Sequence, residues 1–277
     1  IIGIISSTLL WADLKNIYVW TLIFVSLSLG LLGLVDDILK IKFENSSGLK
    51  SRYKFLGQVI IGVLTLLILI KFSDHEYLYN LYFPFFKNLI WDMGLFFVPF
   101  GLFVLIGASN AVNLTDGLDG LATVPVMLVA LSFTLIAYVV GNTIFSDYLQ
   151  IQYIPDVGEL SIFCGSVVGA CLGFLWYNAP PAKIFMGDTG SLSLGGSLAA
   201  IAIIVKHEIV LAIVGGLFVL ETVSVIIQVV SFKLTGKRIF KMAPIHHHFE
   251  KKGWAEPTIV IRFWIIAIIL ALIGLAT

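Results

Sequence analysis

Long apolar stretches alternate along the chain with short polar segments. Eight of the stretches meet or approach the roughly 20 residues that a helix needs to cross a bilayer, and they cover residues 18–35, 55–70, 95–112, 118–140, 160–177, 192–205, 209–230 and 258–276. Residues 1–11 form a shorter ninth stretch. In lipid, only helices satisfy so many backbone groups without the alternating polarity of a β-barrel. The pattern therefore predicts an all-α, polytopic bundle of about nine membrane-spanning helices.

The amino-acid composition supports lipid as the main solvent of this chain. Hydrophobic residues make up 59% of its 277 positions and charged residues 12%, whereas soluble domains carry about 25% charged residues. The formal net charge is zero, so nothing indicates a nucleic-acid partner, which requires a basic surface. We expect residues 1–277 to form a single transmembrane domain.

The apolar stretch at 160–177 carries small residues at helical spacing. Gly165, Gly169 and Gly173 recur every four residues, which predicts close packing against another helix. Cys164 and Cys171 lie seven residues apart and point in the same direction from one helix face. That geometry does not suit a disulfide, so we interpret both cysteines as packing residues.

The basic residues are distributed unevenly between the two sides of the predicted bundle. Thirteen of the 17 Lys and Arg residues lie in, or directly beside, segments 36–54, 107–120, 177–191 and 231–257. The other side carries Lys15, Lys71, Lys87 and Lys206. Because cytoplasmic loops are enriched in Lys and Arg, the four segments are predicted to face the cytoplasm. The aromatic-rich segment 71–93 is predicted to lie at the outer interface.

Two adjacent acids, Asp36 and Asp37, directly follow the first long stretch and precede Lys40. If the helix continues for one more turn, Lys40 lies within pairing distance of both acids. Neighbouring carboxylates offer the hard oxygen ligands that Mg²⁺ prefers, and one of them can act as a base. The alternative is a solvated helix end whose acids only pair with lysines.

A second acidic segment separates two apolar stretches and contains Asn113, Asp116, Gly117, Asp119 and Gly120. No Lys or Arg lies in it, so its carboxylates require a metal ion, a substrate cation or a lysine from another segment. Its glycines permit the backbone to approach a ligand closely. The alternative is a polar turn that caps the next helix.

A third segment begins at Asn178 and leads to Asp188, where the next helix is predicted to start. Pro180 and Pro181 end the preceding helix. Asp188 then lies among Gly and Ser residues, in a position suited to an anion or a metal–phosphate group; a simple helix cap is the alternative. Asp-Thr-Gly-Ser also matches aspartic proteases, but those enzymes need a β-rich cleft, and here the motif introduces a membrane helix.

Three successive histidines, His246, His247 and His248, lie in the most basic segment. Imidazoles donate to phosphate oxygens when protonated and bind softer metals when neutral. Consecutive histidines point in different directions, so they suit phosphate better than one shared zinc ion, for which His-x-x-x-His spacing is typical. An incidental surface run is the third possibility.

Glu221 lies near the middle of an apolar stretch, where an ionised group is costly. We interpret it as a buried structural hydrogen-bond group. Gln228, two helical turns closer to the basic side, is the better candidate for ligand contact.

Together these segments place five aspartates, three histidines and several lysines on one face of the membrane. Such a set fits phosphate chemistry, in which Mg²⁺ and cationic side chains neutralise phosphate oxygens. A site at the bilayer rim also suggests a lipid substrate, so we expect phosphosugar transfer to a lipid carrier. The alternatives are an ion-coupled transporter, which would place carboxylates near the midplane, and a zinc-dependent intramembrane hydrolase.

The four segments together resemble the polyprenyl-phosphate N-acetylhexosamine-1-phosphate transferases. The resemblance rests on Asp36-Asp37-x-x-Lys40, Asn113-Leu-Thr-Asp116-Gly-Leu-Asp119-Gly, Asn178 with Met186-Gly-Asp188-x-Gly-Ser, and Pro244-x-His-His-His-x-Glu250. The histidine segment resembles the bacterial phospho-N-acetylmuramoyl-pentapeptide transferase branch. That branch transfers phospho-MurNAc-pentapeptide from UDP-MurNAc-pentapeptide to undecaprenyl phosphate, giving lipid I and UMP in peptidoglycan biosynthesis. The related branch that uses UDP-GlcNAc is the alternative.

The same resemblance implies roles for individual residues. Asp36, Asp37 and Asp188 would be catalytic, with Asp188 as the Mg²⁺ ligand. Phosphates would be held by Lys40, Lys54, His246, His247 and His248. The nucleotide–sugar pocket would be lined by Asn113, Asp116, Gly117, Leu118, Asp119, Asn178, Phe185 and Gln228. Direct attack and a covalent intermediate both remain open; direct attack is favoured because the lipid phosphate is already an anionic nucleophile.

The family also provides expectations about the rest of the protein. Its members have ten spans, so we expect that the first span is missing here, together with a cytoplasmic Pro-Thr-Met-Gly-Gly segment. Members reside in the bacterial cytoplasmic (inner) membrane with the active site facing the cytoplasm. A homodimer is expected on the same ground.

Overall fold

The computed structural model describes the whole chain except residues 44–47, 74 and 87–88, and most of it is helical. The elements in chain order are α1 (Ile2–Trp11), α2 (Ile17–Lys42), α3 (Ser51–Phe72), α4 (His75–Leu78), β1 (Asn80–Tyr82), β2 (Ile90–Asp92), η1 (Gly94–Phe96), α5 (Phe97–Thr115), α6 (Thr123–Val140), α7 (Thr143–Leu149), η2 (Val157–Glu159), α8 (Leu160–Asn178), α9 (Gly187–Ile204), α10 (Glu208–Val214), α11 (Gly216–Thr235), α12 (Ile245–Glu250) and α13 (Glu256–Leu275). The predicted all-α, polytopic class is confirmed.

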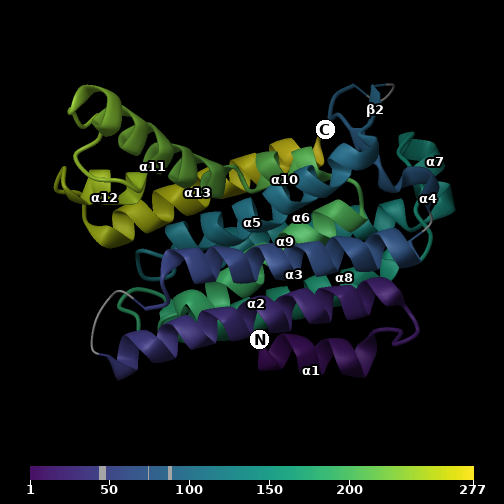
Figure 1. Cartoon of the computed structure of the whole chain (residues 1–277), viewed down its shortest axis with the longest axis horizontal. Coiled ribbons are helices and arrows are strands. Elements are labelled where there is room, and N and C mark those ends of the chain that lie inside the picture. Colours follow the sequence, from purple (N-terminus) through teal and green to yellow (C-terminus); the bar gives the residue numbers. More distant parts are fainter. Residues whose placement is uncertain (44–47, 74, 87–88) are drawn as a thin grey trace.

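The long helices lie roughly along one direction and form a bundle (Figure 1). Within the described part of the chain, eight helices are long and apolar enough to cross a membrane, and the shorter apolar helix α1 precedes them. Figure 1 shows α12 and the end of α2 at one end of the bundle, and β2, α4 and α7 at the opposite end. The polar segments predicted to face the cytoplasm connect helices at the α12 end.

One predicted span is divided into two helices. The stretch 209–230 forms α10 and α11, which meet at Gly215 and Gly216. Glycine in a helix interior is less stable than most other residues, and helices often change direction at glycines. Figure 1 shows α11 diverging from α13 toward the end that holds α12. The hydrophobic pattern continues across the break, so the pattern alone did not predict it.

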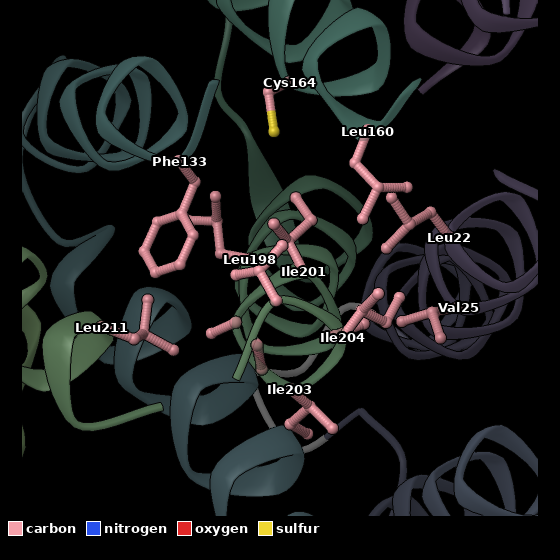
Figure 2. Close-up of a cluster of buried hydrophobic side chains, with 14 of the residues drawn as sticks. Leu22, Val25, Phe133, Leu160, Cys164, Leu198, Ile201, Ile203, Ile204 and Leu211 are labelled. Atoms are coloured by element: carbon pink, nitrogen blue, oxygen red, sulfur yellow. The ribbon is translucent and has the colours of Figure 1, made fainter. Parts of the chain in front are cut away.

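Helix α9 lies at the centre of the bundle, and 83% of its residues are buried. Its residues Leu198, Ile201, Ile203 and Ile204 point outward in several directions, as Figure 2 shows. The side chains that surround them are Leu22, Val25, Phe133, Leu160, Cys164 and Leu211. Small residues let neighbouring backbones come close to α9: a Cβ added at Gly195 would lie 2.5 Å from the carbonyl oxygen of Ala108 on α5.

The predicted packing role of Gly165, Gly169 and Gly173 is wrong. A Cβ added at any of the three meets no atom within 4 Å among the described residues. All three glycines lie on an exposed face of α8. Close contact with the backbone of a neighbouring helix occurs instead at Gly33 of α2 and Gly195 of α9. Cys164 and Cys171 are both free and buried, in line with a packing role.

The aromatic-rich segment 71–93 contains a short antiparallel hairpin, in which β1 pairs with β2 and Leu81 faces Trp91. Tyr79 packs edge-on against Phe97 of α5 at 5.7 Å between ring centroids, which fixes the hairpin to the bundle. Its place at the outer interface stays a prediction. Lys87, one of the basic residues assigned to that side, lies outside the described residues.

A buried ion pair joins α9 to α10 at the end of the bundle opposite the acidic segments. Lys206 Nζ lies 2.7 Å from Glu208 Oε1, and the side chains are 3% and 0% exposed. The ammonium group also lies 4.9 Å from the centre of the Phe97 ring. Burial raises the pKa of Glu208 because it penalises the charged carboxylate, and Lys206 opposes this effect.

We expect Lys206→Met to destabilise the protein by about 3–5 kcal/mol, because it leaves a buried carboxylate without its cation. The apparent unfolding midpoint of the detergent-solubilised protein measures this loss. Combining Lys206→Met with Glu208→Leu should restore most of the stability, since no buried charge then remains. A single variant that unfolds at the wild-type temperature would contradict the prediction.

Candidate active site

The acidic cluster forms where α2 ends and α9 begins. Asp36, Asp37 and Asp188 each offer one carboxylate oxygen, and these atoms lie within 4.8 Å of one another. The two helices come this close because Gly33 of α2 has no side chain. A Cβ at Gly33 would lie 2.2 Å from the carbonyl oxygen of Asp188.

Two lysines converge on the cluster. Lys40 Nζ lies 2.6 Å from Asp36 Oδ2, 2.8 Å from Asp188 Oδ2 and 3.7 Å from Asp37 Oδ1. The pairing predicted from the spacing of Asp36, Asp37 and Lys40 is confirmed. Lys54 of α3 also contacts Asp188 Oδ2, at 2.7 Å. Two cations therefore partly neutralise three carboxylates.

Asn113 completes the surroundings of Asp188. Its Nδ2 donates to Asp188 Oδ1 at 2.6 Å and to the Ser191 hydroxyl at 2.8 Å. Since Lys40, Lys54 and Asn113 come from three different helices, Asp188 is the point where predicted segments 36–54, 107–120 and 177–191 meet. The sequence placed these residues on one face, and the structure brings them into contact.

Asp37 acts as a helix cap for α9. Its carboxylate accepts hydrogen bonds from the backbone N–H groups of Asp188 at 3.2 Å and Thr189 at 2.9 Å, and from the Thr189 hydroxyl at 2.7 Å. Free N–H groups and the helix dipole at the start of α9 favour a negative charge there. Asp36 is also engaged, because its Oδ1 accepts from the Leu49 N–H at 2.7 Å.

The donor set of this cluster fits a hard divalent cation. Carboxylate oxygens are the ligands that Mg²⁺ prefers, and its other positions are usually filled by water or phosphate. Among the described residues, these three aspartates are the one group of acids, histidines or cysteines that converges closely enough to hold a metal ion. The absence of nitrogen and sulfur donors from this group favours Mg²⁺ over zinc.

Asp119 ties the second segment to its neighbours. Its Oδ2 accepts from the Ala182 N–H at 2.8 Å, and its own N–H donates to Glu256 Oε1 at 2.9 Å. Asp116 has no ion-pair partner in the described ranges. Burial raises the pKa of Asp116 to about 7, and the negative charges of Asp188 and Asp37 add to this effect. The sequence-based inference that Asp116 lacks a local cation is confirmed.

Stability is expected to depend on pH through Asp116. Its pKa is 3.8 in the unfolded chain and about 7 in the folded protein, so the folded state holds more protons between these values. Relative to Asp116→Asn, the wild type should therefore lose up to about 4 kcal/mol as pH rises through this window. Unfolding midpoints of both proteins from pH 4 to 8.5 measure the difference. Parallel midpoint curves would refute the role of Asp116.

Two predicted ligand residues use their amides to hold loops. Asn178 is buried; its Oδ1 accepts from the Thr123 hydroxyl at 2.8 Å and its Nδ2 donates to the Ile184 carbonyl at 2.9 Å. Gln228 donates to the carbonyl of Phe240 and accepts from two backbone N–H groups next to it. Phe185, by contrast, is 76% exposed, so its side chain is accessible to a ligand.

The three histidines point in different directions, as predicted. His246 is fully buried and packs against Gly117, where an added Cβ would lie 2.4 Å from its Nε2. His247 is half-buried and its Nδ1 pairs with Glu250. His248 Nδ1 accepts from the N–H of Lys241 at 3.0 Å. The contact between His246 and Gly117 joins segments 231–257 and 107–120. Leu118 packs in a small apolar cluster nearby.

A groove of about 930 Å³ opens at the acidic cluster. At its polar end the lining residues are Asp36, Lys40, Lys54, Asn113 and Asp188. Between α3 and α5 the lining becomes apolar, with Phe55, Val59, Leu102, Phe103 and Ile106. Gln58 and Asn110, which hydrogen bond to each other at 3.0 Å, also line it. Gln58 and Asn110 are polar residues within apolar stretches, so the sequence did contain a signal for the groove. The sequence analysis did not predict the groove from them.

Comparison with known proteins gives consistent matches. Residues 19–206 match the family described as Glycosyl transferase family 4. The chain is similar to Phospho-N-acetylmuramoyl-pentapeptide-transferase from Pelagibacter ubique (strain HTCC1062), with 67% identity over the whole chain and 77% of that relative. The protein of the same name from Rhodopseudomonas palustris (strain BisB18) is 59% identical over 99% of the chain and 76% of that relative.

Proposed function

Because the chain belongs to glycosyl transferase family 4 and, within it, to the phospho-N-acetylmuramoyl-pentapeptide transferases, we propose that UDP-MurNAc-pentapeptide and undecaprenyl phosphate are its two substrates. The chain is a multi-pass membrane transferase of peptidoglycan biosynthesis. The proposed reaction gives lipid I and UMP. One observation carries this proposal: the groove has an acid- and lysine-lined end and an apolar course between α3 and α5.

The groove suits a lipid with an anionic head. Lys40 and Lys54 at its polar end offer cations to a lipid phosphate, and the apolar faces of α3 and α5 match an isoprenoid tail. This arrangement requires the acidic cluster to lie at a membrane surface, and the Lys and Arg distribution favours the cytoplasmic one. Loops 36–54, 107–120, 177–191 and 231–257 would then form one cytoplasmic active site.

Mg²⁺ is the proposed cofactor, and Asp188, with Asp36 and Asp37 beside it, would hold it. When bound, Mg²⁺ supplies positive charge that neutralises phosphate oxygens. The protein contributes two further cations, since Lys40 and Lys54 both reach Asp188. Asn113 keeps the Asp188 carboxylate oriented through its hydrogen bond to Oδ1.

We propose direct attack by the lipid phosphate. A lipid phosphate oxygen forms a bond to the phosphorus that carries the sugar, the bond from this phosphorus to the bridging oxygen breaks, and UMP leaves with that oxygen. A covalent intermediate would require a free carboxylate nucleophile. Asp37 is engaged by three donors of α9, and Asp36 by Leu49 and Lys40. These contacts support orienting and electrostatic roles for Asp36 and Asp37.

The nucleotide–sugar substrate would bind beside this cluster. The proposed lining comprises Asn113, Asp116, Gly117, Leu118, Asp119, Phe185 and Gln228, with His247 and His248 toward the phosphates. Asn178 and His246, which were also predicted to bind substrate, are buried and support this lining from behind. The open ring of Phe185 is suited to stack on a planar base. Asn178, Asp119 and Gln228 support the pocket by holding its loops in place. A homodimer is proposed on the family resemblance alone.

The decisive experiment mixes the purified protein with UDP-MurNAc-pentapeptide and undecaprenyl phosphate and follows lipid I and UMP. We expect product only in the presence of Mg²⁺, and none after treatment with EDTA until Mg²⁺ is restored. UDP-GlcNAc in place of the muramoyl substrate should give no lipid product. Product from UDP-GlcNAc alone would reassign the chain to the related branch.

A further inference from the structure

Glu221 of α11 and His246 of α12 form a buried contact that the proposed reaction does not use. Glu221 Oε1 lies 3.1 Å from His246 Nδ1, and both side chains are 0% exposed. The direction of this contact does not meet the geometry of a hydrogen bond. Among the described residues, the two carboxyl oxygens of Glu221 and the two ring nitrogens of His246 have no hydrogen-bond partner. The interpretation of Glu221 as a structural hydrogen-bond group is therefore wrong, although its predicted burial is confirmed.

Stability does not account for such a pair. Burying polar groups without hydrogen bonds costs free energy. Apolar residues of similar volume are often as stable as a buried ion pair or more so. Leucine at both positions would fill the same space between α11 and α12 without this cost. The pair must therefore be explained by what it holds in place.

The pair lies between the groove and the second acidic segment. Thr222, next to Glu221, lines the groove. On the other side, His246 Nε2 faces Gly117, so closely that a Cβ there would be 2.4 Å away. The rings of His246 and His247 lie 4.2 Å apart between centroids, and His247 is the more exposed of the two.

We propose that Glu221 is a positioning residue that acts through His246. It fixes the His246 ring between α11 and Gly117, and this ring in turn orients His247 and the backbone at Gly117 for the nucleotide–sugar substrate. His246 stays buried and does not touch substrate, which leaves His247 and His248 as the imidazoles available to phosphate. This inference rests on the proposed function, because it concerns the same site.

The test uses the full chain in detergent and measures kcat for UMP release per folded molecule, together with the unfolding midpoint. Glu221→Gln keeps the size of the side chain but replaces one carboxyl oxygen with an amide nitrogen. We expect it to fold and to lower kcat by about 10- to 100-fold, the range found when a residue that orients a metal-bound histidine is replaced. Glu159→Gln, at the opposite end of the bundle, is the matched control and should retain the wild-type kcat.

A double replacement separates positioning from stability. Glu221→Leu combined with His246→Leu should unfold at or above the wild-type midpoint while kcat stays low. Trypsin should also cleave Glu221→Gln faster than the wild type after Lys251 and Lys252, because α12 is held less firmly.

Three outcomes overturn the proposal. They are wild-type kcat in Glu221→Gln, recovery of kcat in the double variant, and failure of Glu221→Gln to fold, which would assign the pair to stability. A wild-type protein that releases no UMP would instead count against the proposed function itself.

Discussion

Replacing Asp188 with Asn is expected to lower the rate of UMP release by about 1,000-fold, equivalent to about 4 kcal/mol of activation free energy. Asp188 is the carboxylate on which Lys40, Lys54 and Asn113 converge. An amide at this position carries no charge, so it binds a divalent cation weakly and leaves the two lysines partly uncompensated. The helix cap from Asp37 contacts only backbone groups of residue 188, so the protein should remain folded.

The matched control for this change is Asp147→Asn. Asp147 is exposed on α7, at the far end of the bundle from the acidic cluster (Figure 1), and its replacement should leave the rate unchanged. Mg²⁺ should raise the unfolding midpoint of the wild type and of Asp147→Asn but not that of Asp188→Asn. An Asp188→Asn protein with more than a tenth of wild-type activity would exclude Asp188 as the essential metal ligand.

The sequence predicts the features that depend on local pattern. Bilayer thickness fixes the length of an apolar helix, so the spans could be located from hydrophobicity alone. Helical geometry places residues three and four apart on one face, which is why the pairing of Lys40 with Asp36 and Asp37 was predictable. The shared face of the acidic segments followed from counting the crossings of the chain.

Contacts between distant helices could not be predicted in the same way. The cap that Asp37 gives to α9 and the contact between Glu221 and His246 both depend on which helices cross and at which residue. Glycine spacing also misled the interpretation, because Gly165 lies on an exposed face whereas Gly33 lies at a helix crossing. Small residues permit a close crossing, but they do not specify its partner.

Amide side chains illustrate a second reason why residue roles could not be predicted from the sequence. Asn178 and Gln228 were predicted to bind substrate because their amides donate and accept hydrogen bonds. The structure shows the same groups bound to the backbone of the loops that surround the site. Both uses need the same chemical group. Only the position of the neighbouring backbone distinguishes a ligand contact from a loop support.

Gly33→Ala is expected to reduce activity about 100-fold, because displacing catalytic groups by about 1 Å costs this much in rate. The added Cβ would lie 2.2 Å from the carbonyl oxygen of Asp188, 2.4 Å from its carbonyl carbon and 2.6 Å from the nitrogen of Thr189. All three are backbone atoms, so no side-chain rotation can relieve the contact. The start of α9 must move away from α2, which takes Asp188 away from Asp37 and Lys40.

The matched control is Gly165→Ala on α8, where an added Cβ meets no atom within 4 Å. Alanine favours a helix more than glycine does, so this variant should be at least as stable and as active as the wild type. UMP release and Mg²⁺-dependent stabilisation of both variants measure the difference. Equal activity in the two variants would mean that α2 and α9 can separate without cost to the site, and the close crossing at Gly33 would then have no role in catalysis.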